Sequence, residues 1–133
     1  MIALTLKTHI RSYSEGTMRA ISLPLHGALE MLAAPAIMAT PFVLGFGQAA
    51  TVITVLIGAL LLGLSLQADG PGRVVPPSAH AGFDLSLATA GLAAGLAIGF
   101  STGEWVAGAF LVGIGAAQVA LTALTRFTVA RGA

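Results

Sequence analysis

The sequence predicts an all-α protein, a four-helix transmembrane bundle built from two parallel, same-orientation helical-hairpin repeats. Three observations predict it. Of the 133 residues, 56% are hydrophobic and 8% are charged, whereas roughly 25% are charged in a soluble domain. The apolar residues fall in blocks at about 23–45, 49–67, 82–100 and 104–125, each near the roughly 20 residues that a helix needs to cross a bilayer. A pattern that opens the first block returns in the second half of the chain.

The composition also excludes several classes of protein. The blocks do not alternate like the strands of a membrane barrel, and backbone groups in lipid must pair within the segment, which leaves helices. The absence of cysteine excludes disulfides, thiolate metal sites and cysteine nucleophiles. A net charge of +1 without a dense basic patch gives no indication of a nucleic-acid partner.

The N-terminal segment, residues 1–22, is expected to be cytoplasmic. It is either an interfacial helix on the anionic inner leaflet or a frayed tail. Apolar residues recur in it at helical spacing beside basic ones: Ile2, Leu6, Lys7, Ile10, Arg11 and Tyr13. The apolar block that follows is expected to be a retained helix and not a cleaved signal peptide, because small residues lie in its middle and no cleavage signal follows it.

The first membrane hairpin is predicted over residues 23–67. Its first helix carries His26 and Glu30 near the start and two prolines, Pro35 and Pro41, further on. Each proline removes a backbone hydrogen bond, so we expect a kink. Thr40 is expected to serve as a partner for a carbonyl freed in this way.

The end of this helix resembles a known repeat. Thr40-Pro41-Phe42, followed by Val43-Leu44-Gly45-Phe46, is similar to the signature of the SPW-repeat family of small bacterial integral membrane proteins, with Thr and Phe in place of Ser and Trp. The resemblance implies a two-helix hairpin fold. It implies no activity, because the family is not tied to one. The second copy keeps only the Gly-Phe ending, Gly99-Phe100.

A cytoplasmic loop over residues 68–81 is expected to lead to the second hairpin, 82–125, and a cytoplasmic tail, 126–133. Ser78 is a candidate cap for the third helix. A shift of 54 residues places His26 on His80 and Glu30 on Asp84, and it also aligns Gly45 with Gly99 and Phe46 with Phe100. One extra residue in the second outer loop would then bring Gly58 onto Gly113. The sequence therefore predicts an internal duplication whose copies insert the same way up.

Helix packing is expected along one face of the third helix, where Gly91, Gly95 and Gly99 follow one another at four-residue spacing. Small residues let transmembrane helices approach closely. The line either packs within the bundle, which is the favoured interpretation, or forms a homodimer face. Further small residues are Ala88, Gly108, Gly113, Gly115 and Ala116.

The orientation is predicted by the basic residues. With four crossings, the N-terminus, the middle loop and the C-terminus share one side, and every Lys and Arg lies on it: Lys7, Arg11, Arg19, Arg73, Arg126 and Arg131. The positive-inside rule makes this side the cytoplasm. The predicted location is the bacterial inner membrane, with Glu104 and Trp105 at the outer surface.

The repeated pairs are the candidate site: His26, Glu30, His80 and Asp84. Residues four apart share a helix face, so each histidine is expected to touch its acid. Three interpretations stay open. The pairs are structural, with early acids favouring the helix N-terminus. They bind a ligand, either a metal such as zinc or haem iron between two imidazoles. Or they line a proton or cation path, whose outer lining would be thin: Thr51, Thr54, Thr89, Ser101, Thr102 and Gln118.

No sequence motif indicates a catalytic residue, so the predicted function is a non-enzymatic, structural or partner-binding membrane component. The alternative is a metal- or haem-binding membrane protein, and a transport element ranks below both. The expected surroundings are the lipid bilayer and, beside it, a membrane-protein partner or a second copy of the chain. No cofactor is the leading expectation, with zinc or haem b as candidates.

Overall fold

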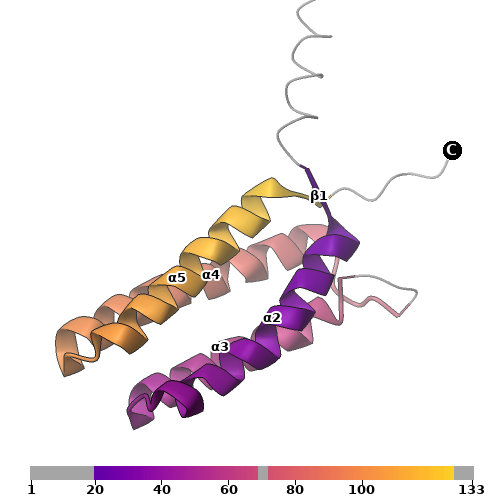
Figure 1. Ribbon diagram of the computed structural model, residues 1–133. Coiled ribbons are helices and arrows are strands. Elements are labelled where there is room, and N and C mark those ends of the chain that lie inside the picture. The colour runs from indigo at the N-terminus through magenta and orange to yellow at the C-terminus, as the bar shows by residue number, and fades with distance from the viewer. Residues whose placement is uncertain (1–19, 69–71, 128–133) are drawn as a thin grey trace, which may run out of the picture.

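The computed structural model describes residues 20–68 and 72–127, and in these residues the protein is an all-α four-helix bundle (Figure 1). The predicted interfacial segment lies outside the described residues up to position 19. Two short strands, which the sequence did not predict, pair in parallel at one end of the bundle. The elements are β1 (Ile21–Ser22), α2 (Leu23–Leu44), α3 (Gln48–Ser65), α4 (Pro77–Thr102), α5 (Trp105–Leu124) and β2 (Thr125–Arg126).

The helix ends follow local chemistry. The Ser22 side chain accepts a hydrogen bond from the Leu25 amide at 3.4 Å and so caps α2. α2 and α4 end at Gly45 and Gly103, with φ of 68° and 75°, a left-handed conformation that glycine adopts without a steric penalty. α4 begins at Pro77, five residues before the expected apolar block. Proline is favoured at a first helical position because its φ is already helical.

Ser78 therefore lies inside α4 and does not cap it. The N-cap is Pro76, and no side-chain hydrogen bond is made there. Neither Glu30 nor Asp84 lies in the first turn of its helix. The field of the helix dipole acts mainly within the first turn. The expected stabilisation of these acids by the helix N-terminus is therefore weak.

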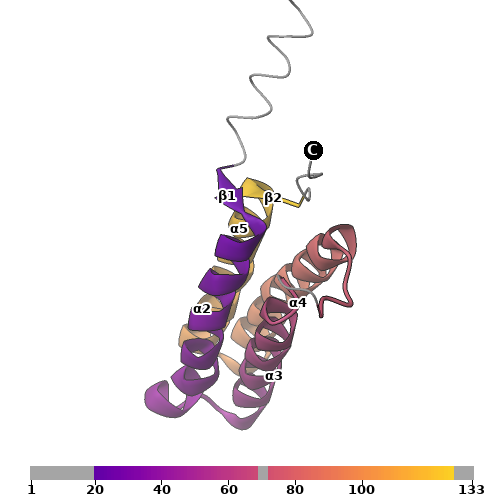
Figure 2. The ribbon, with the colours of Figure 1, turned by 90° about the vertical axis from the view of Figure 1, so that its right-hand side faces the viewer.

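The helices form two hairpins, α2 with α3 and α4 with α5, that lie side by side (Figures 1 and 2). Contacts join α2 to α3, α3 to α4, α4 to α5 and α5 to α2, and a few join α3 to α5, whereas α2 and α4 have the sparsest backbone contact of all the helix pairs. α2 and α4 are therefore diagonal partners, and side chains on their inner faces meet at the bundle axis. Packing is closer within each hairpin than between the hairpins.

The glycine line of α4 faces α5. A Cβ atom on Gly95 would lie 2.5 Å from the Gly108 carbonyl oxygen, and one on Gly99 would lie 2.6 Å from the Trp105 ring. Gly91 is buried against Gly115 in the same interface. The line thus packs inside the hairpin and is not available as a homodimer face. Two of the other small residues, Gly113 and Ala116, are exposed instead.

The two hairpins correspond closely at the end that bears the histidines. α2 and α4 begin 54 residues apart, at Leu23 and Pro77. The second helices correspond with a shift of 57 residues, because Gly58 packs on the Ala34 carbonyl as Gly115 packs on the Ala88 carbonyl. The expected match of Gly58 with Gly113 is wrong, since no atom comes within 4 Å of a Cβ built on Gly113. The extra residues lie in the helix and not in the turn: α4 is four residues longer than α2, whereas the second turn, 103–104, is one residue shorter than the first, 45–47.

α2 passes through both prolines as one helix. The Thr40 hydroxyl donates to the Ala36 carbonyl at 2.7 Å. It therefore does not bond the Ile37 carbonyl, which is the one that Pro41 leaves without its helical donor.

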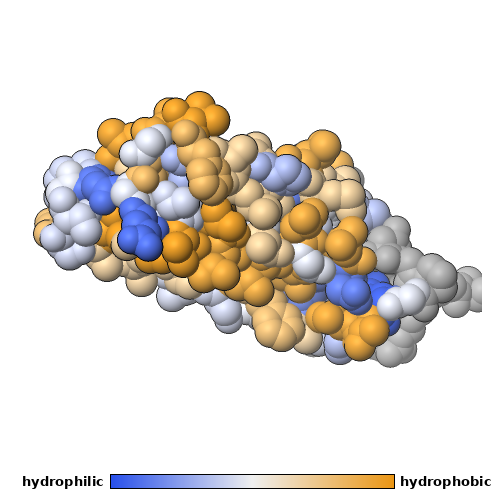
Figure 3. All heavy atoms as spheres, turned by 90° about the horizontal axis from the view of Figure 1, so that it is seen from below, coloured by the Kyte–Doolittle hydropathy of each residue, from blue (hydrophilic) through white to orange (hydrophobic). Residues whose placement is uncertain are grey.

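All four helices are long and apolar enough to cross a membrane, and the protein is a multi-pass membrane protein. Large apolar side chains face outward, such as Leu32, Phe42 and Phe100, which are 78%, 71% and 77% exposed. Contiguous exposed apolar surface of this kind suits lipid and not water. Figure 3 shows the apolar surface between polar patches at the two ends of the visible face. At the end opposite the strands, the Gly47 amide donates to Glu104 Oε2 at 2.8 Å and ties the two hairpin turns together.

Candidate metal centre

Four ionisable side chains meet between the hairpins. His26 and Glu30 come from α2, and His80 and Asp84 come from α4. Each histidine is the fourth residue of its helix and each acid the eighth, so the two pairs lie at the same depth, near the strand end of the bundle. All four are buried, with at most 2% of any of them exposed. One donor atom from each lies within 4.8 Å of the others.

The pairs are interleaved across the axis. His26 Nε2 lies 3.2 Å from Glu30 Oε1 in its own helix and 3.0 Å from Asp84 Oδ2 in α4. His80 Nε2 lies 3.7 Å from Asp84 Oδ2 and 3.7 Å from Glu30 Oε2. Each imidazole thus faces both carboxylates. The pairs predicted from helical spacing form one cluster at the axis, not two separate ion pairs.

The hydrogen bonds of His26 define which nitrogen carries a proton. The Thr125 hydroxyl donates to the Leu121 carbonyl at 2.6 Å, and a hydroxyl has one hydrogen to donate. The contact of 2.8 Å between His26 Nδ1 and Thr125 Oγ1 therefore requires Nδ1–H as the donor. In a neutral ring, the Nε2 lone pair then faces two carboxylates. This arrangement is favourable only with a second proton on the ring or with a cation between the groups.

Several polar atoms of the cluster have no hydrogen-bond partner among the described residues: His26 Nε2, Glu30 Oε2, both ring nitrogens of His80 and both carboxylate oxygens of Asp84. Buried polar groups are rarely left in this state. The interhelical contacts are close, but they lack hydrogen-bond geometry. Four of these atoms, one from each residue, lie in mutual contacts of 3.0 to 3.7 Å, as donor atoms do around a shared ion: His26 Nε2, Glu30 Oε2, His80 Nε2 and Asp84 Oδ2.

α5 and the residues that follow it supply the outer contacts of the cluster. Gln118 Nε2 donates to Glu30 Oε1, and Thr125 holds His26. The Phe127 ring packs edge-on against His26, with ring centroids 5.5 Å apart, and against His80 at 6.2 Å. The imidazoles themselves are 5.6 Å apart. Phe127 thus covers the cluster from the strand end.

The sequence interpretation misplaced one of these residues. Gln118 was expected to line the outer half of the helices, yet it lies beside Glu30 at the histidine end, with 6% of its surface exposed. Thr125 and Phe127 were not singled out. One signal was present: Gln118 is the only amide side chain in an otherwise apolar helix, α5, and a buried amide needs a polar partner.

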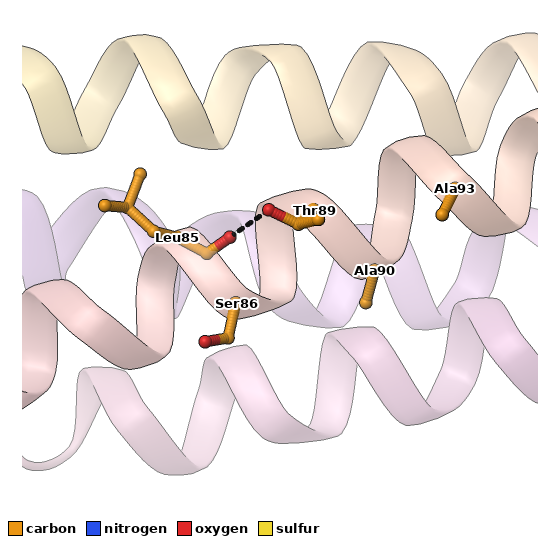
Figure 4. A pocket seen from close by; sticks show the side chains of 5 residues that line it. All are labelled: Leu85, Ser86, Thr89, Ala90 and Ala93. Carbon is orange, nitrogen blue, oxygen red and sulfur yellow. Dashed lines mark hydrogen bonds between the residues drawn. The ribbon is translucent and has the colours of Figure 1, made fainter.

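A separate shallow groove lies on α4, lined by Leu85, Ser86, Thr89, Ala90 and Ala93 (Figure 4). The Thr89 hydroxyl donates to the Leu85 carbonyl in its own helix, so it adds no free donor to the groove. Ser86 and Thr89 are exposed, whereas Asp84 is buried. The groove shares no residue with the cluster and does not lead into it.

Comparison of this chain with protein families, with curated proteins and with solved structures found no match. Its function must therefore be inferred from the cluster itself.

Proposed function

We propose that this membrane protein binds one divalent transition metal ion between its two hairpins, with His26, Glu30, His80 and Asp84 as ligands. The carrying observation is the set of distances between imidazole nitrogen and carboxylate oxygen, which run from 3.0 to 3.7 Å. Ligand atoms about 2.0–2.1 Å from a tetrahedral zinc ion are about 3.3 Å from each other. The observed distances lie on both sides of this value.

The donor set favours zinc or a similar ion. Imidazole suits zinc, copper, iron and nickel, whereas magnesium and calcium prefer oxygen ligands alone. Charge supports the same choice, because one divalent ion neutralises the two buried carboxylates without any further proton. A buried carboxylate without such compensation is strongly unfavourable.

The contact with Thr125 also fits a metal ligand. Histidines that bind metals usually donate their other ring N–H to an oxygen, which fixes the tautomer and the ring orientation. His26 does so through Nδ1 and presents Nε2 to the cluster.

A structural role fits this site better than a catalytic one. Catalytic zinc usually keeps one position open for water or substrate, whereas structural zinc has four protein ligands. Here the chain supplies four buried ligands, two from each hairpin. The ion would join hairpins whose direct packing is sparse, which suits a non-enzymatic structural membrane component with a membrane partner or a second copy.

Haem is a poorer fit than a small ion. Two axial imidazoles would have to leave a slot for the macrocycle between them. Here carboxylate oxygens lie 3.0 and 3.2 Å from His26 Nε2, where that slot would be. We therefore propose a metal ion alone.

The proposal includes the origin and location of the chain. The matching helix starts and the equivalent Gly58 and Gly115 contacts support an internal duplication, and the SPW-repeat type is proposed from the sequence resemblance alone. Arg73 and Arg126 lie at the histidine end, and Trp105 lies at the other. This distribution supports a bacterial inner-membrane protein with both termini in the cytoplasm.

Metal analysis of the full chain tests the function. The protein, purified in detergent and stripped with a chelator, is titrated with zinc, and the bound metal is quantified by mass spectrometry after desalting. We expect one ion per chain and, with cobalt as the probe, visible absorption bands of a tetrahedral site. E30Q and D84N should each lower zinc affinity strongly.

E104Q is the matched control, because it removes a carboxylate at the opposite end of the bundle. It should bind zinc like the parent. Binding that is absent in the parent chain, or that E30Q and D84N leave unchanged, would refute the proposed function.

A further inference from the structure

The two short strands lie directly beyond the cluster and join the first and last described elements. β1 pairs in parallel with β2, with Ile21 opposite Thr125 and Ser22 opposite Arg126. We call these four residues the clasp. Figure 2 shows the clasp connecting the start of α2 to the end of α5. It therefore joins the first and the last elements of the described residues.

Thr125 belongs to the clasp and to the cluster at the same time. Its backbone lies in β2, and its side chain is 0% exposed. The side-chain oxygen accepts a hydrogen bond from His26 Nδ1–H at 2.8 Å. Its own hydroxyl hydrogen goes to the Leu121 carbonyl. A rotation of the His26 ring thus cannot occur without breaking a bond to a clasp residue.

The residue after the clasp adds a second contact. Phe127 packs against both imidazole rings. Two residues beyond α5, Thr125 in β2 and Phe127 after it, therefore contact the His26 ring, one by hydrogen bonding and one by packing.

The corresponding position in the first hairpin lacks this connection. The shift of 57 residues that relates α3 to α5 places Ala68 at the position of Thr125. Alanine has no hydroxyl, and His80 Nδ1 has no hydrogen-bond partner among the described residues. The hydrogen-bonded link between the cluster and the clasp therefore runs through His26 and Thr125.

We propose that Thr125 is a positioning residue that couples metal binding to the clasp, so that loading the cluster holds β1 and β2 together. This inference rests on the proposed function. A metal ion bound to His26 Nε2 fixes the imidazole ring and strengthens the Nδ1–H donor, which stabilises Thr125 in β2. By linkage, a formed clasp raises metal affinity by the same factor.

The test measures zinc affinity together with hydrogen exchange of backbone amides in the full chain in detergent. In the parent protein, zinc should slow exchange in peptides that cover the clasp. T125V should weaken zinc binding about 10- to 100-fold, the usual effect of removing such an outer contact. Even at saturating zinc, hydrogen exchange at the clasp of T125V should not become slower.

Two variants control for side-chain packing. T125S keeps the hydroxyl, so it should retain the zinc affinity of the parent, and zinc should still slow hydrogen exchange at its clasp. T122V removes a buried hydroxyl in the preceding helix, α5, that has no hydrogen-bond partner among the described residues, and it should also behave like the parent.

The outcomes separate the two proposals. If the parent binds no zinc, both fall. If it binds zinc but exchange at the clasp does not change, the coupling is refuted and the metal site stands; this result needs no variant and holds even if T125V does not fold. Equal effects of T122V and T125V would also refute the coupling, because they would show a loss of packing and not of the bond to His26.

Discussion

Removal of the two carboxylates, singly and together, gives the sharpest test of whether the cluster is one site. Glu30 and Asp84 lie on different helices and both contact His26 Nε2, at 3.2 and 3.0 Å. If they share one ion, E30Q removes the ion's contribution to stability and D84N removes the same contribution. The double variant then loses that contribution once, not twice.

The expected size of the effect follows from linkage. At a zinc concentration of about 100 times Kd, a bound ion adds about 2.7 kcal/mol to the free energy of unfolding. Two independent losses would total about 5.4 kcal/mol, so a shared ion gives an interaction energy of about 2.7 kcal/mol. This is well above the roughly 0.5 kcal/mol within which separate sites are additive.

The assay is equilibrium unfolding in mixed micelles for the parent, both single variants and the double variant, with zinc and with a chelator. The interaction energy should be large with zinc and should shrink when the metal is removed. Additive effects under both conditions would show two independent local pairs and would eliminate the shared ion. An equal interaction energy under both conditions would show coupling through protons and not through metal.

Three further predictions concern the frame around the cluster. G95L should lower the thermal stability in detergent by at least the 1–3 kcal/mol typical of overpacking, whereas G113L, on the exposed face of α5, should melt like the parent; equal melting of both would show that the glycine line faces lipid. A cysteine at Ser101 should react with an impermeant thiol reagent added to intact cells and one at Ser78 should not, and the reverse pattern would invert the topology. E104Q should cost about 0.5–1.5 kcal/mol through its weakened backbone hydrogen bond, and unchanged unfolding would show that the turns are held by packing alone.

Most of the bundle could be predicted from the sequence, because the length of an apolar block is enough to identify a membrane helix. The fourth block, expected at 104–125, is α5 at Trp105–Leu124. The start of α4 was not found, because residues 77–81 are too polar for a hydropathy criterion. The signal there was local: Pro77 fits the first position of a helix and would have placed the boundary correctly.

The match of the second helices was harder to predict. Gly and Ala recur so often in α3 and α5 that several alignments bring small residues together. Only the contacts distinguish Gly115 from Gly113 as the equivalent of Gly58. Sequence spacing cannot decide this, because extra residues can lengthen either the turn or the helix before it, as they do in α4.

The four residues of the cluster could be placed together from helix periodicity and the repeat, whereas their hydrogen-bond partners could not. His26 and Glu30 share a helix face by their spacing, and the repeat placed His80 and Asp84 at the same depth. Thr125 and Gln118 reach the cluster across separations of 99 and 88 residues. No local sequence pattern encodes such contacts, because they depend on how the two hairpins pack against each other.

The division of the four ligands between the hairpins has a consequence for biogenesis. His26 and Glu30 enter the membrane with the first hairpin, whereas His80 and Asp84 arrive 54 residues later with the second. A chain whose second hairpin inserted upside down would place the two halves at opposite surfaces of the bilayer, where neither can complete a four-ligand site. If the cluster binds a metal as proposed, a filled site therefore exists only in molecules whose hairpins were inserted in the same orientation, and metal content then measures correct insertion.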